Sequence, residues 1–339
     1  VCLGTSELGM MRCSIVIVTF NGWPHVRRCL EAIEPELSDG VDVTAIDNGS
    51  TDGVPDRIRA SFPWVQLIES SSNLGFAAGC NLGIRNTSGE FVMLLNSDVV
   101  VQPGFVNELL APFSEAPRLG ASAAAMVFQR NPSIVASAGI EIFRNGLALD
   151  HCLGAQRAQL VDRQPVFGAS GGAAAFRRTA LDDVGLFPEA YFMYLEDVDL
   201  GWRLRLRCWD IVLAANAIAE HASSASSGEG SPFKRRLLAR NRIWLIARCY
   251  PSWLLARTWW RIALYDALVV GSSPLRRDGS SVRGRVSALR GIRSRLAERR
   301  QIQTRSTAKR EDLERWVLAD PSPGEVLRLR QLSRDLANR

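Results

Sequence analysis

FVMLLNSDVVV, from Phe91 to Val101, is an apolar run interrupted only by Asn96, Ser97 and Asp98. Short apolar runs rich in β-branched residues are typical of strands that are covered on both faces, as in parallel sheets. In open α/β sheets, ligands bind beyond the carboxyl ends of the strands. We therefore predict a buried strand whose polar end lies at a binding edge.

Asn96 and Asp98 are two residues apart, so in an extended segment their side chains point the same way. A buried carboxylate needs a partner or a metal ion, and an oxygen-lined pocket suits a hard divalent cation together with a diphosphate. The alternative is that Asn-Ser-Asp only turns the chain before a helix starting near Pro103. The triplet alone leaves both interpretations open.

Three further strands are predicted before this one, the first of them buried, and each is followed by a polar turn and then a helix. They span Ser14 to Phe20, Val41 to Ile46 and Val65 to Ile68. Four such alternations in the first ~115 residues predict an α/β fold with a mostly parallel central sheet flanked by helices. No G-x-G-x-x-G follows the first strand and no P-loop motif occurs, which argues against the standard dinucleotide-binding and P-loop folds.

Composition is that of a globular protein with one large domain or two smaller ones. Of the 339 residues, 47% are hydrophobic and 22% are charged. Seven scattered cysteines without a C-x-x-C pair suggest reduced thiols in a cytosolic setting. The sequence shows neither an apolar run of ~18–20 residues nor a secretory signal pattern. Because Val1 to Gly9 carries no pattern, we expect translation to begin at Met10 or Met11.

Five ordered motifs carry a resemblance to a known family. They are VTFN (18–21), IDNGSTDG (46–53), NLGFAAGCNLGI (73–84), LLNSD (94–98) and FMYLEDVDLGWR (192–203). Together, over Ser14 to Ser226, they resemble the family 2 glycosyltransferases with a GT-A (Rossmann-like) fold. Asn-Ser-Asp in place of Asp-x-Asp resembles the bacterial rhamnosyltransferase branch of that family.

The resemblance implies a nucleotide-sugar donor bound at the strand ends. In the family, the acid closing the second strand contacts the base, which points to Asp47, although an Asx-turn explains the same residue. Small residues at the start of the third helix either admit a ligand or reflect close helix–sheet packing. The donor-binding residues implied are Thr19, Asn21, Asp47, Asn73, Gly75, Gly79, Asn81, Asn96 and Asp98.

The resemblance also implies a divalent cation, Mg²⁺ or Mn²⁺, on the donor diphosphate. Asp98 matches the family's metal ligand, and His221, after a predicted strand from Asp210 to Ala214, matches a second one. A divalent ion suits this chemistry because the leaving nucleoside diphosphate develops negative charge. A lone histidine is also commonly structural.

A cluster of acids opens a predicted amphipathic helix that runs from Glu196 to about Cys208. Acids are common in a first helical turn because the helix dipole favours them. The resemblance instead implies that Asp197 is the general base of a single in-line displacement with inversion. Gly171, Gly172 and Glu196 would then lie in the acceptor region. Two departures from the family pattern, Cys208-Trp209 and Ser224-Ala225-Ser226, touch no reacting group.

The segment Gly168-Ala169-Ser170-Gly171-Gly172 also fits the nucleophile elbow of a serine hydrolase, with His221 downstream. That motif requires a strand, a sharp turn and a helix. Because AAAFRR follows it, we favour a strand of small residues that lines the acceptor site.

The carboxyl-terminal third has a different character. Ser223 to Ser231 is predicted to close over the donor or to act as a linker. Pro232 to Gly271 predicts two helices broken at Pro251, whose tryptophans and arginines suit either an anionic membrane interface or a hairpin packed on the catalytic domain. From Arg276 to Arg310, eleven Arg and one Lys face two acids, a net charge of +10. No nucleic-acid recognition motif accompanies this charge. Short polar helices are expected after Glu311, around Pro321 and Pro323.

We therefore expect residues 1–13 to precede a GT-A catalytic domain at 14–231, with a nucleotide-binding half (14–115) and an acceptor half (116–231). Residues 232–339 would form a helical, Arg-rich extension. The expected activity is transfer of a sugar, with rhamnose from dTDP-rhamnose favoured, to a polysaccharide or lipid-linked glycan of the cell envelope. A UDP-sugar donor, a non-catalytic membrane or complex scaffold, and remotely a serine hydrolase are the alternatives. A cytoplasmic location, peripheral on the inner membrane face, is expected.

Overall fold

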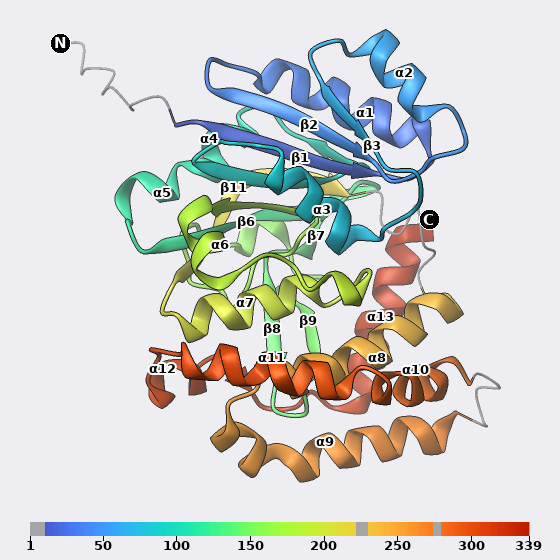
Figure 1. Ribbon diagram of the computed structural model, residues 1–339, viewed down its shortest axis with the longest axis vertical. Coiled ribbons are helices and arrows are strands. Elements are labelled where there is room, and N and C mark those ends of the chain that lie inside the picture. Colours follow the sequence, from blue (N-terminus) through green and yellow to red (C-terminus); the bar gives the residue numbers. More distant parts are fainter. Residues whose placement is uncertain (1–10, 222–229, 274–278, 339) are drawn as a thin grey trace.

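A computed structural model describes residues 11–221, 230–273 and 279–338 of the chain (Figure 1). Its centre is a nine-stranded sheet with the order β3-β2-β1-β4-β10-β6-β11-β5, and β7 pairs with β6 outside this path. The expectations for Val1 to Gly9, for Met10 and for residues 222–229 fall outside the described residues.

The first half of the sheet is parallel, as predicted. Its strands are β1 (Cys13–Thr19), β2 (Val41–Asp47), β3 (Gln66–Glu69) and β4 (Phe91–Asn96). They alternate with α1 (Trp23–Ile33), η1 (Glu34–Glu36), α2 (Val54–Ser61) and α3 (Phe76–Arg85). The predicted strand, turn and helix order of this half is therefore confirmed.

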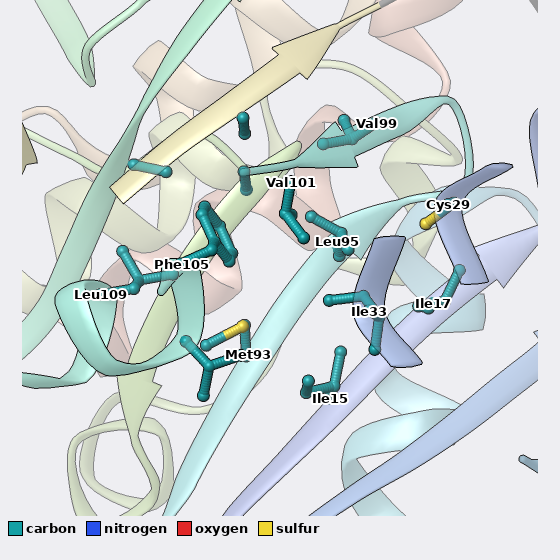
Figure 2. Packing of buried hydrophobic residues seen from close by; sticks show 14 of the residues in the cluster. Ile15, Ile17, Cys29, Ile33, Met93, Leu95, Val99, Val101, Phe105 and Leu109 are labelled. Atoms are coloured by element: carbon teal, nitrogen blue, oxygen red, sulfur yellow. The ribbon is translucent and has the colours of Figure 1, made fainter. Parts of the chain in front are cut away.

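Each strand at the centre of the sheet buries both of its faces. Ile15 and Ile17 of β1 lie with Met93 and Leu95 of β4 in one cluster, which α1 and α4 (Phe105–Leu110) cover (Figure 2). Val16, between the two isoleucines, lies in the cluster on the other face, which α3 covers. This two-sided burial explains why the strands are continuous apolar runs.

The predicted buried strand with a polar end is confirmed as β4, but the second strand that follows it was not predicted. The strand β4 ends at Asn96, and Ser97 and Asp98 form a turn into β5 (Val99–Val101). The polar residues break the extended run, and the valines after them pair antiparallel with β11 (Asp210–His221) at the opposite edge of the sheet. The polar triplet therefore joins two strands, and α4 begins only after the second.

The second half of the sheet is mixed. The strand β10 (Ala173–Arg177) runs antiparallel to both β4 and β6 (Leu119–Phe128), whereas β11 is parallel to β6. Here β11 is longer than predicted, and His221 is its last residue rather than a residue beyond it. The remaining elements here are α5 (Pro112–Glu115), β7 (Asn131–Ser137), β8 (Ile140–Phe143), β9 (Ala148–Asp150), η2 (Arg157–Gln159), α6 (Arg178–Val184) and η3 (Glu189–Tyr191).

The helix α7 (Glu196–Leu206) is buried on all sides rather than amphipathic as predicted. Sheet residues cover one side of it, and Trp202 packs on the other side with Leu245 and Tyr250 from the carboxyl-terminal third. The prediction failed because the covering residues lie far away in sequence.

The carboxyl-terminal third is helical and packs against the rest of the chain. Two helices broken at Pro251 are confirmed as α8 (Pro232–Cys249) and α9 (Ser252–Ser272). They are followed by α10 (Ser280–Leu289), α11 (Ile292–Thr304), α12 (Arg310–Glu314), β12 (Val317–Leu318) and α13 (Pro323–Asn338). The last helix has 16 residues, so the expectation of only short helices is wrong. The strand β12 joins β8 and β9 in a small second sheet.

Among the described helices, none combines the length and the apolar character needed to cross a bilayer.

Candidate active site

A cleft of about 1690 Å³ opens at the carboxyl ends of β1 and β4. Its walls come from the turn between β4 and β5, the segment before β10, the start of α7, and α8. Most of the residues predicted from the strand ends line it: Thr19, Asn21, Asn73, Gly75, Asn96, Asp98, Gly171, Gly172, Glu196, Asp197 and His221.

Asp98 and His221 meet in this cleft although they are far apart in the chain. The strand β5 pairs with β11, and Val99 lies opposite His221. Asp98, the residue before Val99, therefore lies next to the imidazole of His221. Asp98 Oδ1 lies 3.4 Å from His221 Nε2. Burial opposes the charge on both groups, but each favours the charged form of the other, so the pKa of Asp98 is lowered and that of His221 is raised.

This pair supplies one carboxylate and one imidazole, a donor set that suits Mn²⁺ and accommodates Mg²⁺. Within the residues that the structure describes, no group of three or more His, Cys, Asp or Glu side chains forms a metal cluster. An ion held here would therefore take its remaining ligands from a diphosphate and water.

Asp197 stands at the amino-terminal end of α7, at the wall of the same cleft. Its Oδ2 accepts a hydrogen bond from the Gly171 amide at 3.1 Å, and its Oδ1 accepts one from the Val198 amide at 2.8 Å. Burial raises its pKa despite these hydrogen bonds. The neighbouring Glu196 is 4% exposed, and its Oε2 has no hydrogen-bond partner. Burial, reinforced by the charge of Asp197, raises the pKa of Glu196 well above its usual range.

The segment that leads into α7 is conformationally unusual. Phe192, Tyr194 and Leu195 all have positive φ values, between 66° and 72°, which bulky residues rarely adopt. Asn241 of α8 is fully buried and its Nδ2 donates to the carbonyls of Tyr191, Met193 and Tyr194 at 3.1, 2.9 and 2.8 Å. A residue of the carboxyl-terminal third thus holds the segment that positions the acids.

The opposite end of the cleft is built around Asn48, which sequence reasoning missed as a site residue. Its Nδ2 donates to Asn73 Oδ1 and to the Gly75 carbonyl, both at 3.1 Å, and its Oδ1 accepts from the Leu74 amide at 2.9 Å. Asn48 follows Asp47 in the quoted motif IDNGSTDG. Side chains alternate in direction along a strand, so Asp47 and Asn48 at the end of β2 cannot both face the cleft. This alternation is the sequence signal that would have favoured Asn48.

Three predicted donor-binding residues are not among the residues that line the cleft. Asp47 is 2% exposed, and its Oδ2 accepts from the Ser50 amide as an Asx-turn residue does. A Cβ atom on Gly79 would lie 2.8 Å from Val18, so this glycine permits close helix–sheet packing. The side chain of Asn81 is used by the Phe187 backbone, with bonds of 2.9 and 3.0 Å. For Gly79 and Asn81 the geometry favours the structural interpretation. Oδ1 of Asp47 is buried without a hydrogen-bond partner among the described residues, so its contact with the nucleotide base stays a prediction.

His25 is a further cleft residue that was not singled out from the sequence. It lines the cleft, and its charge contributes to the lowered pKa of Asp98. No signal in the sequence showed that His25, in the first turn of α1, would lie near Asp98, because the two residues are far apart in the chain. The third histidine, His151, is instead bonded to Glu141 at 2.8 Å and to Gln164 at 2.7 Å.

Comparison with known proteins decides the family. The model of glycosyl transferase family 2 matches residues 14–185, half of the chain. An N-acetylglucosaminyl-diphospho-decaprenol L-rhamnosyltransferase of Mycobacterium tuberculosis is 31% identical over 288 residues, which is 76% of this chain and 93% of the relative. The chain belongs to glycosyl transferase family 2. It is a glycosyltransferase, and the predicted resemblance is confirmed.

Solved structures show that this glycosyltransferase has the GT-A fold. A mannosyltransferase of Pyrobaculum calidifontis, in complex with GDP-Man and Mn²⁺, matches with a TM-score of 0.54 and 16% identity over 86% of this chain and 84% of that one. GalNAc-T7 with UDP, GalNAc and Mn²⁺ matches with a TM-score of 0.57 and 14% identity over 71% of this chain and 48% of that one.

The nucleophile-elbow motif of this glycosyltransferase does not have the context of a hydrolase. Ser170 is followed by the strand β10, whereas an elbow requires a helix. Gly171 and Gly172 instead border the cleft beside Asp197 and Asn96.

Proposed function

We propose that this glycosyltransferase transfers L-rhamnose from dTDP-rhamnose to a lipid-linked N-acetylglucosaminyl diphosphate in cell-envelope glycan synthesis. The sequence identity to the rhamnosyltransferase relative, which extends over three quarters of this chain, supports L-rhamnose as the sugar and the lipid-linked acceptor. The dTDP nucleotide is what the resemblance to the rhamnosyltransferase branch implies. The observation that carries the proposal is the convergence of Asp98, His221 and Asp197 in one cleft.

Asp98 and His221 are proposed to hold a divalent cation on the donor diphosphate. Their carboxylate and imidazole fit such an ion, as argued above. The ion would supply positive charge that stabilises the leaving nucleoside diphosphate. Thr19 and Asn21 at the end of β1, with Asn48, Asn73 and Gly75 beside them, would bind the nucleoside.

Asp197 is proposed to be the general base. It would accept the proton of the acceptor hydroxyl while that oxygen forms a bond to the anomeric carbon and the bond from this carbon to the diphosphate oxygen breaks, with inversion. The Gly171 and Val198 amides orient the carboxylate. Its raised pKa makes it a stronger base than an exposed aspartate. Glu196, whose pKa burial raises well above its usual range, would lie beside the acceptor.

The carboxyl-terminal wall of the cleft suits an anionic acceptor. Lys234 and Arg235 of α8 and Arg330 and Arg334 of α13 all line it. A diphosphate that links a sugar to a lipid carries the negative charge that such a wall attracts. We accordingly retain the proposed division into a catalytic domain at 14–231 and an extension at 232–339, with the extension completing the acceptor side.

The test is a transfer assay with dTDP-rhamnose, UDP-glucose and UDP-N-acetylglucosamine as donors and a short-chain N-acetylglucosaminyl-diphospho-lipid as acceptor. Each donor is assayed with Mn²⁺, with Mg²⁺ and with a chelator. We expect rhamnosyl transfer that requires the ion. Transfer from a UDP-sugar alone would replace the rhamnose proposal by the UDP-sugar alternative. Absence of transfer from every donor would favour a scaffold.

A further inference from the structure

The helix α9 has an outward face without any charged side chain along most of its length. From Trp259 to Gly271, every exposed residue is apolar. The four largest side chains are 64%, 46%, 52% and 57% exposed, and they belong to Trp259, Trp260, Leu264 and Leu268. They recur with Ala263 and Ala267 at intervals of three and four residues, which places them on one side of the helix. We name these six residues the α9 apolar face.

The inward side of α9 is polar and fixed to the rest of the protein. Asp266 accepts from Arg242 of α8 at 2.9 Å and pairs with Arg285 of α10 at 2.8 Å. Arg261 pairs with Asp320 at 2.9 Å. The α9 apolar face therefore points outward because the opposite side is held by ion pairs, and the helix lies at the edge of the molecule farthest from α1 and α2 (Figure 1).

Basic side chains border this face on α9 itself. The guanidinium of Arg261 lies 4.4 Å from the centroid of the Trp260 ring, and Arg257, one turn before this ring, is 57% exposed. The helix α10, which carries exposed Arg283, packs on α9. The arrangement is an apolar strip with tryptophans at one end and arginines beside them. Such a combination fits an anionic lipid surface, since tryptophan favours the interfacial zone and each arginine adds attraction to lipid headgroups.

The same helix also reaches the cleft. Tyr265, Val269 and Ser272 of α9 line the cleft, one or two residues away from the exposed positions. A surface that bound the α9 apolar face would therefore lie beside the acceptor end of the active site.

We propose that the α9 apolar face lies in the headgroup zone of an anionic membrane, with α9 parallel to the membrane plane. The partner is thus a lipid surface rather than a second protein. In this orientation the acceptor side of the cleft lies near the membrane from which a lipid-linked acceptor projects. This consequence rests on the proposed function. The charged inward side is compatible with an in-plane helix.

The test is flotation of the full chain with vesicles of equimolar phosphatidylglycerol and phosphatidylcholine, and with vesicles of phosphatidylcholine alone. We expect the wild type to float with the anionic vesicles, and the variant Trp259→Gln/Trp260→Gln to lose about tenfold or more in partitioning. The control Val161→Gln, at a position 61% exposed and distant in sequence, should partition as the wild type does.

A second measurement separates this inference from the proposed function. With a water-soluble acceptor the double variant should keep wild-type transfer, whereas with acceptor embedded in anionic vesicles its transfer should fall. Equal flotation of the double variant and the wild type, or no flotation of the wild type, would overturn the inference alone. Absence of transfer by the wild type to the soluble acceptor would instead count against the proposed function.

Discussion

The proposed chemistry depends on Asp197, a half-buried carboxylate whose two oxygens are oriented by backbone amides. We predict that Asp197→Asn lowers kcat by about 10²- to 10⁴-fold, since general-base catalysis contributes on that scale. The nearly isosteric amide keeps the shape of the site, so the Kd for the donor nucleotide should change little. Steady-state kinetics and nucleotide titration measure the two quantities. A variant with wild-type kcat would remove Asp197 from the role of base.

The raised pKa of Asp197 also predicts the pH dependence of the reaction. A base acts only when deprotonated, so kcat/KM should fall as the pH drops through the raised pKa, above the usual aspartate value of 3.8. Burial is the physical cause. The measurement is kcat/KM against pH at saturating metal ion, with nucleotide binding followed in parallel. If the fall of kcat/KM at low pH follows a loss of nucleotide binding instead of a loss of turnover, a group other than Asp197 causes this pH dependence.

At the scale of single residues, the sequence predicted which strand ends and turns meet at the cleft better than it predicted which side chains face into it. Asp98, His221 and Asp197 all line the cleft, whereas Asp47, Gly79 and Asn81 do not. A motif identifies the residue types at a strand end, but which side chain faces the ligand depends on strand pairing and on distant partners such as Phe187. Asn48 was missed for the same reason.

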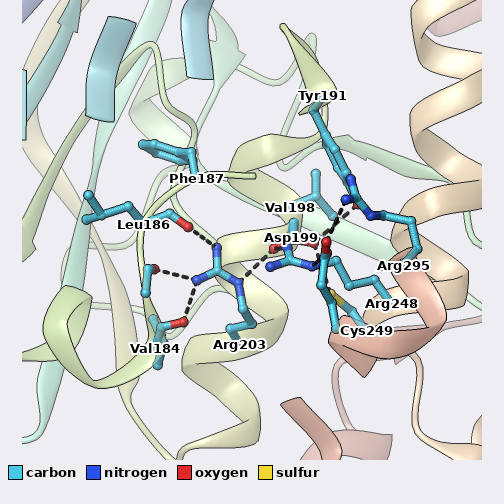
Figure 3. Close-up of polar contacts among 12 residues, drawn as sticks. Val184, Leu186, Phe187, Tyr191, Val198, Asp199, Arg203, Arg248, Cys249 and Arg295 are labelled. Carbon is cyan, nitrogen blue, oxygen red and sulfur yellow. Dashed lines mark hydrogen bonds and ion pairs between the residues drawn. The ribbon is translucent and has the colours of Figure 1, made fainter. Parts of the chain in front are cut away.

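At the scale of the elements, α7 is fixed by a buried ion network centred on Asp199 (Figure 3). Asp199 is fully buried and accepts from Arg203 Nε at 2.7 Å, while Arg248 of α8 forms a second ion pair with it. Tyr191 donates its hydroxyl to Asp199 Oδ2 at 3.2 Å. The catalytic helix is thereby attached to the carboxyl-terminal third.

Loss of the Asp199 carboxylate should therefore destabilise the fold. We predict that Asp199→Ala lowers the free energy of unfolding by about 3–5 kcal/mol, because the buried guanidinium of Arg203 loses its counter-charge and Arg248 keeps only its ion pair with Glu298. Chemical denaturation measures the change. The exposed ion pair of Arg27 with Glu31 provides the control, since Glu31→Ala should cost less than about 1 kcal/mol. Equal effects of the two substitutions would contradict the account of the network.

The same network has a defined pH dependence. Burial alone would raise the pKa of Asp199, but Arg248 and Arg203 lower this pKa to about 2, below the usual aspartate value of 3.8. A lowered folded-state pKa means that the stabilisation is complete above the unfolded value and is lost as the pH falls from about 4 towards about 2. The free energies of unfolding of the wild type and of Asp199→Asn should therefore converge as the pH falls through this window. Acid denaturation curves measure this convergence.

Asn241 is a positioning residue, because it holds the strained segment before α7. We predict that Asn241→Ala lowers kcat by about tenfold or more while the KM for the donor stays near its wild-type value, since a small displacement of catalytic groups has effects of this size. Steady-state kinetics and a melting curve measure both effects. If KM and kcat change together, or if the variant merely melts lower with unchanged kcat, Asn241 has only a structural role.

Elements were predicted best where the pattern is local. Parallel strands with their helices follow from short apolar runs and polar turns, so the first half of the sheet was anticipated. The division of Phe91 to Val101 into β4 and β5 was not, because β5 exists only through its pairing with β11. The all-round burial of α7 likewise depends on α8.

At the scale of the whole molecule, the cleft is assembled from both ends of the chain. The family model matches residues 14–185, yet His221, Lys234, Arg235 and the lining residues of α9 and α13 lie beyond it. The sequence indicated the donor side through motifs, whereas the acceptor side comes from helices whose sequence carries no motif. The expected helical extension is therefore also a wall of the active site.

The central claim is that Asp98 with His221 binds the donor through a divalent cation, while Asp197 acts only in the reaction. The most direct measurement is the melting temperature of the wild type, Asp98→Ala and Asp197→Asn with dTDP, with and without Mn²⁺, because a ligand that binds the folded state raises it. We predict Mn²⁺-dependent stabilisation by dTDP in the wild type and in Asp197→Asn, and its loss in Asp98→Ala. Undiminished Mn²⁺-dependent stabilisation of Asp98→Ala would contradict the claim.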